Sequence, residues 1–202
     1  RGAEEALRPE DGRDACREAL ADCLEESERV MTMLNTLMDV SEAETGTMKL
    51  LLEDINLSAL IEEVVELYDY VAQEKGIELS TNAPTDLYLR GDRDRLRQVL
   101  ANLVDNAVKY TPSGGHIDIE ALKNGQQAVL LVKDNGIGIP VDEIPRIWER
   151  LYRGDKSRSQ RGLGLGLSLV KAVVQAHNGR VEASANLGGG SVFFVYLPLP
   201  RA

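Results

Sequence analysis

Three glycines alternate with three leucines directly before an apolar, helix-like run that ends at Val170. Glycines at this spacing let consecutive backbone N–H groups point toward one anion, and the positive end of a following helix favours the same negative charge. The pattern matches neither the Walker phosphate loop nor the dinucleotide fingerprint. It predicts a phosphate-binding turn, with a flexible hinge as the alternative, and the regular leucines favour a turn that packs on one side. The six residues are Gly162, Leu163, Gly164, Leu165, Gly166 and Leu167.

Two asparagines stand four positions apart in a segment predicted to be a helix from residue 92 to residue 110. Asn102 and Asn106 would share one helix face, while the leucines and valines around them form the core side. Asn is a weak helix former, so two in register invite a functional reason. An amide oxygen can bind Mg²⁺ as a neutral ligand, and Lys109, one turn further on, could reach a phosphate. The alternative is that both amides are simply solvated.

An aspartate stands at the end of a predicted strand and is followed by two glycines. Asp134 could accept a hydrogen bond from an exocyclic amine, while Gly136 and Gly138 let the backbone approach a flat ligand. The same Asp-Asn-Gly stretch is also a good turn sequence, so a purely structural role stays open.

Helices and strands must bring these three stretches together. Apolar residues recur at three- and four-residue steps from residue 13 to about residue 44, which predicts a long amphipathic helix. The end of another helix precedes it and is closed by a turn at residues 9–12. The two form a helical hairpin with one apolar stripe, which favours a dimeric four-helix bundle over packing on the rest of the chain.

A second domain is expected from residue 47 to residue 202, after a first domain of residues 1–46. Strands are predicted at 48–55, 77–81, 87–90, 117–122, 128–132, 181–185 and 192–197, with helices at 57–74 and 92–110. This order predicts an α+β fold in which one mixed sheet is covered by helices. Residues 141–161 fit neither period and are rich in arginine and lysine, which predicts a long basic loop with a function.

The bulk composition narrows the function. The chain has 202 residues and a net charge of −10, which argues against a general role in nucleic-acid binding. Cys16 and Cys23 are too far apart on one helix to bridge each other and are predicted to be core thiols. There is no apolar run of about 20 residues and no signal peptide, so a cytoplasmic location is expected. The missing initial Met suggests a fragment of a longer protein.

The three stretches, in this order, resemble the ATP-binding boxes of sensor histidine kinases, in the wider GHKL family with gyrase and Hsp90 ATPases and their Bergerat fold. Residues 102–110 resemble the N box, 134–140 the first glycine box, 147–153 the aromatic box of the lid, with Trp148 in place of the usual Phe, and 162–167 the second glycine box. The resemblance implies ATP and Mg²⁺ as ligands. It implies that Asp134 binds the adenine amine, that Asn106 binds the metal, and that Asn106, Lys109 and Arg153 are catalytic. The ATP-binding set would be Asn102, Asn106, Lys109, Tyr110, Asp134, Gly136, Gly138, Ile139, Tyr152, Arg153, Gly162, Leu163, Gly164, Leu165, Gly166 and Leu167.

Two departures from the family's patterns refine the expected activity. The related ATPases carry a Glu where this chain has Asn102, and an amide cannot serve as a general base, so hydrolysis should be poor and phosphoryl transfer is favoured. The only histidines, His116 and His177, are expected to be structural, so the phosphoacceptor His is absent and this polypeptide should not phosphorylate itself. The alternatives are an ATP-binding scaffold without transfer and a GHKL ATPase. The implied partners are a second copy, through the hairpin, and a response regulator receiver domain, with membrane attachment only through other parts of a parent protein.

Overall fold

The computed structural model describes residues 13–154, 164–186 and 188–200. The chain divides into two compact units, Arg1–Met38 and Asp39–Ala202. Helix α2 (Arg13–Glu44) has the predicted bounds; most of it belongs to the first unit, and its last turns belong to the second. Residues 1–12, which hold the first arm of the predicted hairpin, lie outside the described residues.

Within the first unit, α2 presents an exposed apolar stripe. Cys23 is exposed too, so its prediction as a core thiol was wrong, while the side chain of Cys16 lies outside the described residues. The physical reason is that the described part of this unit is a single helix, which has no core of its own. The exposed large apolar residues of the stripe are Leu20, Leu24, Val30, Met31, Leu34 and Met38.

The second unit is built on a five-stranded mixed sheet with the strand order β2-β4-β5-β7-β6. Its strands are β2 (Glu78–Asn82), β4 (His116–Asn124), β5 (Gln127–Asp134), β6 (Arg180–Ala185) and β7 (Ser191–Pro198). Only β2 and β4 pair in parallel; the other three pairings are antiparallel. The β4–β5 hairpin turns between Asn124 and Gln127, as the Asn-Gly pair predicted.

A separate two-stranded ladder joins β1 (Glu53–Asn56) to β3 (Tyr88–Gly91). The sequence predicted a longer first strand over residues 48–55. The strand is short because β3 offers only four residues, and the register ends at the pair Glu53↔Gly91, which leaves the preceding residues without a ladder partner.

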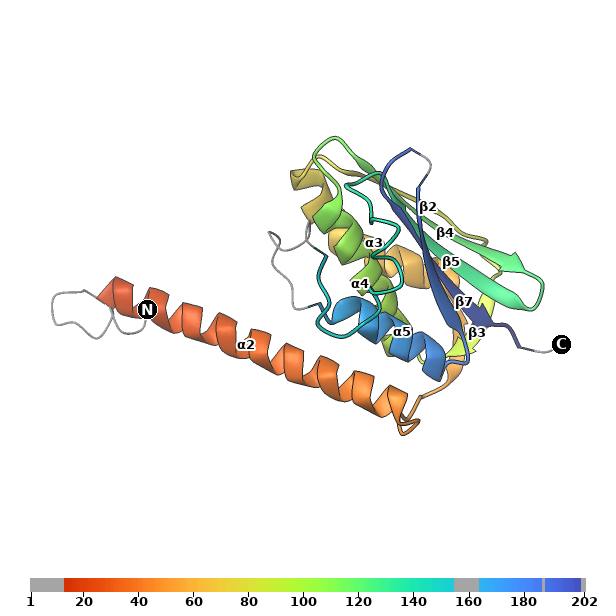
Figure 1. The fold of residues 1–202 in the computed structure, drawn as a ribbon, viewed down its shortest axis with the longest axis horizontal. Helices are drawn as coiled ribbons and strands as arrows, with labels where there is room; N and C mark the ends of the chain where they lie inside the picture. Colours follow the sequence, from red (N-terminus) through yellow and green to blue (C-terminus); the bar gives the residue numbers. More distant parts are fainter. Residues whose placement is uncertain (1–12, 155–163, 187, 201–202) are drawn as a thin grey trace. The chain divides into compact units, whose positions relative to one another are not determined.

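Helices α3 (Leu57–Glu74), α4 (Arg93–Tyr110) and α5 (Gly166–Ala176) lie against one face of the five-stranded sheet (Figure 1). Asn56 caps α3 by accepting a hydrogen bond from the Ala59 N–H, and Asp92 caps α4 by accepting one from the Arg95 N–H. These caps explain why both helices begin within one residue of their predicted starts.

The core lies between the three helices and the inner face of the sheet. Side chains alternate along β4 and β5, so every second residue points inward, while α4 buries the stripe that carries Leu100 and Leu103. The largest contributors are buried to 1% exposure or less, and each is worth about 1.5–3 kcal/mol of burial. The predicted α+β fold with one mixed sheet covered by helices is confirmed. None of the helices in the described ranges has the length and apolar character needed to cross a membrane.

Candidate nucleotide-binding site

The end of α4 is joined to the loop that follows β5. The Ile137 N–H donates to the Tyr110 carbonyl at 3.1 Å, and a Cβ added to Gly136 would lie 2.4 Å from that carbonyl oxygen. Only glycine fits this approach, so the N-box segment and the first glycine segment are in contact. The ammonium of Lys75 donates to the carbonyls of Val108 and Lys109, which satisfies two acceptors at the C-terminus of α4. Sequence reasoning gave Lys75 no role.

Asp134 is a buried carboxylate at the end of β5, with 4% of its surface exposed. Its Oδ1 accepts hydrogen bonds from the N–H groups of Gly136, at 2.8 Å, and Ser191, at 3.2 Å. Burial raises the pKa of the Asp134 carboxyl, and the two backbone donors partly oppose that rise. No hydrogen bond among the described residues goes to Oδ2, so this oxygen can accept one from a ligand.

A second loop fixes the backbone of Asp134 from the other side. The Asn186 amide donates to the Asp134 carbonyl at 3.0 Å, and Gly190, at φ +88°, lies so close that an added Cβ would be 2.1 Å from that oxygen. Gly138 in turn approaches Gly190, because its added Cβ would lie 3.1 Å from the Gly190 oxygen. Sequence reasoning missed this support, although a run of three glycines before Ser191 was the available signal.

The two asparagines of α4 have different surroundings. The Asn102 amide donates to the Gln98 carbonyl at 2.8 Å, and its oxygen faces Gly166, whose added Cβ would lie 2.7 Å away. Asn102 therefore contacts the first residue of α5. Asn106 is half-buried, and its side chain makes no hydrogen bond to any described residue, so its amide oxygen can bind a cation. Lys109, one turn on, is paired with Asp105.

The predicted phosphate-binding turn leads into α5 and contacts the predicted aromatic box. Gly164 has φ +70°, and its added Cβ would lie 2.7 Å from the Tyr152 carbonyl oxygen. Leu165 is buried and Leu167 packs partly buried against the core, as their spacing predicted. Among the described residues, no side chain caps the N-terminus of α5, so its first N–H groups are available to bind an anion. Gly162 and Leu163 lie outside the described residues.

The described part of the basic loop is anchored by its aromatic residues. The Trp148 ring meets Phe193 edge to face with centroids 6.0 Å apart, and the Arg146 guanidinium lies 4.5 Å from the centre of the Tyr152 ring. Arg153 is half-buried in the same segment, and Ile139 packs against the core at the start of the loop. The four predicted stretches therefore meet through Tyr110 with Gly136, Asn102 with Gly166, and Tyr152 with Gly164.

Both histidines have structural partners. His177 is buried: its Nδ1–H donates to the Val173 carbonyl and its Nε2 accepts from the Asp92 N–H, and burial lowers its pKa. His116 is exposed, but its backbone and ring both bond to the Asn135 side chain, which ties β4 to the end of β5. Both histidines therefore make structural contacts, and their exclusion as phosphoacceptors stays a prediction.

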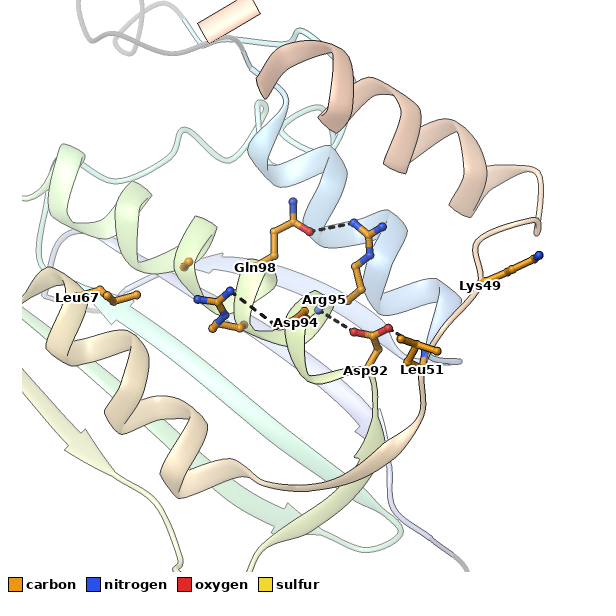
Figure 2. Close-up of a pocket in the computed structure, with 9 residues that line it drawn as sticks. Lys49, Leu51, Leu67, Asp92, Asp94, Arg95 and Gln98 are labelled. Carbon is orange, nitrogen blue, oxygen red and sulfur yellow. Dashed lines mark hydrogen bonds and ion pairs between the residues drawn. The ribbon is translucent and has the colours of Figure 1, made fainter. Parts of the chain in front are cut away.

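A pocket of about 650 Å³ lies elsewhere, around the N-terminal half of α4 (Figure 2). Three pairs of its lining residues are already engaged with each other: Arg95 with Gln98, Arg97 with Asp94, and Asp92 with the Leu51 N–H. No residue of the predicted ATP-binding set lines it. The lining residues are Lys49, Leu51, Leu67, Asp92, Asp94, Arg95, Arg97, Gln98 and Ala101.

Comparison with known proteins gives one family. Residues 91–201 match the family described as histidine kinase-, DNA gyrase B-, and HSP90-like ATPase. The chain is 38% identical over 171 residues to the adaptive-response sensory kinase SasA of Synechococcus elongatus. This match covers 84% of this chain and 44% of SasA.

Two solved structures have the same fold. Full-length ShkA in complex with AMPPNP has a TM-score of 0.81 and 28% identity, with 100% of this chain and 42% of that chain covered. Histidine kinase ThkA in complex with response regulator protein TrrA has a TM-score of 0.73 and 23% identity. The match covers 98% of this chain and 55% of the ThkA chain. The chain therefore spans less than half the length of SasA and of ShkA.

Proposed function

The chain belongs to the histidine kinase-, DNA gyrase B- and HSP90-like ATPase family, and on that premise we propose that it transfers the γ-phosphoryl group of ATP to a histidine of a sensor kinase. Within this proposal, residues 47–202 form the catalytic domain. Residues 1–46 form part of a dimerisation and phosphotransfer hairpin, through which two copies associate. The acceptor histidine lies outside this chain.

One observation carries the proposal: Asp134 keeps one carboxylate oxygen fixed by two backbone N–H groups while its other oxygen receives no hydrogen bond from a described residue. A buried acceptor of this kind suits the exocyclic amine of adenine, because the amine donates and the ring is flat. Gly136 and Gly138 let the backbone pack closely beside this carboxylate, because an added Cβ would lie 2.4 Å from the Tyr110 carbonyl oxygen at Gly136 and 3.1 Å from the Gly190 oxygen at Gly138.

The phosphates would lie between α4 and the start of α5. Asn106 would bind Mg²⁺, which neutralises charge on the phosphates as the bond to the γ-phosphoryl breaks. The half-buried amide of Asn106 would offer one neutral oxygen ligand, and the nucleotide oxygens and water would supply the others. Lys109, Tyr152 and Arg153 would contact the phosphates or cover the nucleotide, and the uncapped N–H groups at the start of α5 would add donors.

Transfer rather than hydrolysis follows from Asn102. Its amide is bonded along its own helix and packs against Gly166, and an amide does not take up a proton near neutral pH. Water in this site therefore lacks a general base at this position. The phosphoryl group on the acceptor histidine would then be passed to an aspartate of a response regulator. The ThkA–TrrA complex supports this class of partner. We place the domain in the cytoplasm, with any membrane attachment made by other parts of a parent protein.

The proposal is tested with radiolabelled ATP and Mg²⁺. We expect no acid-labile label on this chain alone, because His177 is buried and His116 is held by Asn135. The acceptor in the second assay is a longer form of the protein that carries the residues before Arg1 and has its own site inactivated by Asn106→Asp. When this chain is added to it as the kinase, we expect label on the longer form. Rapid release of phosphate without label on either protein would instead indicate an ATPase.

A further inference from the structure

A forked ion pair joins the last turn of α2 to the segment of residues 147–153. The Arg150 Nε donates to Glu44 Oε1 at 3.3 Å, and a second guanidinium nitrogen pairs with Glu44 Oε2. Both residues belong to the unit Asp39–Ala202. Two nitrogens on two carboxylate oxygens fix the orientation of the guanidinium as well as its position. The pair therefore restrains the direction in which the chain continues after Arg150.

The next residue, Leu151, needs such a restraint. Its φ of 60° lies in the left-handed region, which is unfavourable for a leucine and persists only where neighbouring contacts hold it. On its far side, the Leu151 N–H donates to the Gly164 carbonyl at 2.9 Å. Leu151 is thus held between the Arg150 ion pair and the second glycine segment.

Glu44 extends from a firmly packed base. Val40, one turn earlier in α2, is 1% exposed in the core, and Asp39 pairs with Arg95 of α4 at 2.6 Å. These contacts keep the last turns of α2 on the catalytic unit without the help of Glu44. The Glu44–Arg150 pair therefore connects a fixed helix end to the segment beside the proposed nucleotide site.

We propose that Glu44 is a positioning residue for nucleotide binding: through Arg150 it holds Leu151 and Tyr152 against Gly164, so that the phosphate side of the site is organised before ATP arrives. This inference rests on the proposed function, and it assigns Glu44 no contact with the nucleotide. It also makes the end of α2 an element to which nucleotide affinity responds.

The test compares affinities for AMPPNP with Mg²⁺ by calorimetry in the wild-type chain, Glu44→Gln, Arg150→Gln and the double variant. The pair is partly exposed, at 38% and 55% of the two side chains, so we expect each single change to weaken binding by about three- to five-fold. The double variant should be no weaker than either single one, because all three lose the same contact. The charge swap Glu44→Arg with Arg150→Glu should restore most of the affinity. Salt of about 0.5 M should reduce the differences in affinity between the variants and the wild type, because it screens the ion pair.

Glu63→Gln is the matched control, because it removes a partly exposed Glu–Arg pair that joins α3 to α4 instead of leading to Leu151. Its affinity should equal that of the wild type. Unchanged or tighter binding by Glu44→Gln, or a swap no better than the single variants, would overturn the inference.

Hydrogen exchange separates this inference from the proposed function. In the nucleotide-free chain, the Leu151 amide should exchange about three- to five-fold faster in Glu44→Gln than in the wild type, since the same pair is lost. If the wild type binds no AMPPNP, the proposed function fails, and this exchange rate alone decides the role of Glu44. Equal exchange in both proteins would overturn it.

Discussion

The two ends of the candidate site are held by different kinds of contact. Around Asp134, the contacts come mainly from backbone: N–H groups of Gly136 and Ser191 bind the carboxylate, and Gly190 packs directly on the main chain. At the other end, Lys109 pairs with Asp105 and Arg150 pairs with Glu44, and these side chains are partly exposed.

This difference has a consequence for binding. Backbone contacts in a packed region leave few alternative conformations, so the Asp134 end, where we propose that adenine binds, is formed in the free protein. The partly exposed Lys109–Asp105 pair contributes about 0–1 kcal/mol, and Lys109 could exchange Asp105 for a phosphate, whereas the Glu44–Arg150 pair is proposed to stay in place. The Asp134 end of the candidate site therefore has a fixed shape, whereas Lys109 at the other end is a cation that can change its partner.

The largest effect is expected from Gly190→Ala. Its φ of +88° disfavours any side chain, and the new Cβ would lie 2.1 Å from the Asp134 carbonyl oxygen. We expect a loss of about 3 kcal/mol or more in the free energy of unfolding, together with loss of nucleotide binding. Urea unfolding measures the first and calorimetry the second.

Gly188→Ala is the control for that change, because a Cβ at Gly188 meets no atom within 4 Å. It should leave both the stability and the affinity close to wild type. Equal losses for the two variants would show that the loop as a whole, and not its contact with Asp134, is sensitive.

At the phosphate end, two changes to one ion pair should act in opposite directions. Lys109→Gln should weaken AMPPNP binding by about ten-fold, because it removes a cation that can reach phosphate. Asp105→Asn should tighten binding by about two-fold, because it releases Lys109 from its present partner. Calorimetry at one salt concentration compares the AMPPNP affinities of the two variants. If both changes weaken binding, then AMPPNP binding depends on the intact Lys109–Asp105 pair and not on a free lysine.

The smallest effect concerns pH and the buried His177. Burial lowers the pKa of His177 from the ordinary 6.5, and the nearby Asp92 carboxylate opposes that shift. Because the pKa is lower in the folded protein, the unfolded chain takes up a proton first as pH falls. Stability from the neutral ring is therefore complete above pH 6.5 and is lost as pH falls below it. In urea unfolding between about pH 5 and pH 8, the wild type should lose more stability toward acid than His177→Gln. Parallel pH profiles would contradict this role.

Sequence reasoning recovered the elements that periodicity encodes and missed the contacts that tertiary packing creates. The bounds of α2 and α3 followed from the spacing of apolar residues, and for α3 also from its Asn56 cap, and Asp134 stood out because it ends a strand before glycines. The short β1 was missed because its length is set by its partner strand. The exposure of Cys23 was missed because an apolar stripe does not reveal whether anything covers it. The support from Asn186 and Gly190 joins residues more than fifty positions from Asp134, and no local pattern announces such a contact.

The central claim, that Asp134 receives the adenine amine, is tested most directly by calorimetric titration of AMPPNP with Mg²⁺ into the wild type and Asp134→Asn. The variant can still accept the hydrogen bonds of Gly136 and Ser191 through its amide oxygen, but it turns an N–H donor toward a ligand donor. We expect wild-type binding and a loss of about 100-fold or more in the variant. Because burial raises the pKa of Asp134, its charge costs stability as pH rises above the ordinary carboxyl value of 3.8, so the variant should be as stable as the wild type or more stable at pH 7. Equal affinities in two folded proteins would contradict the account.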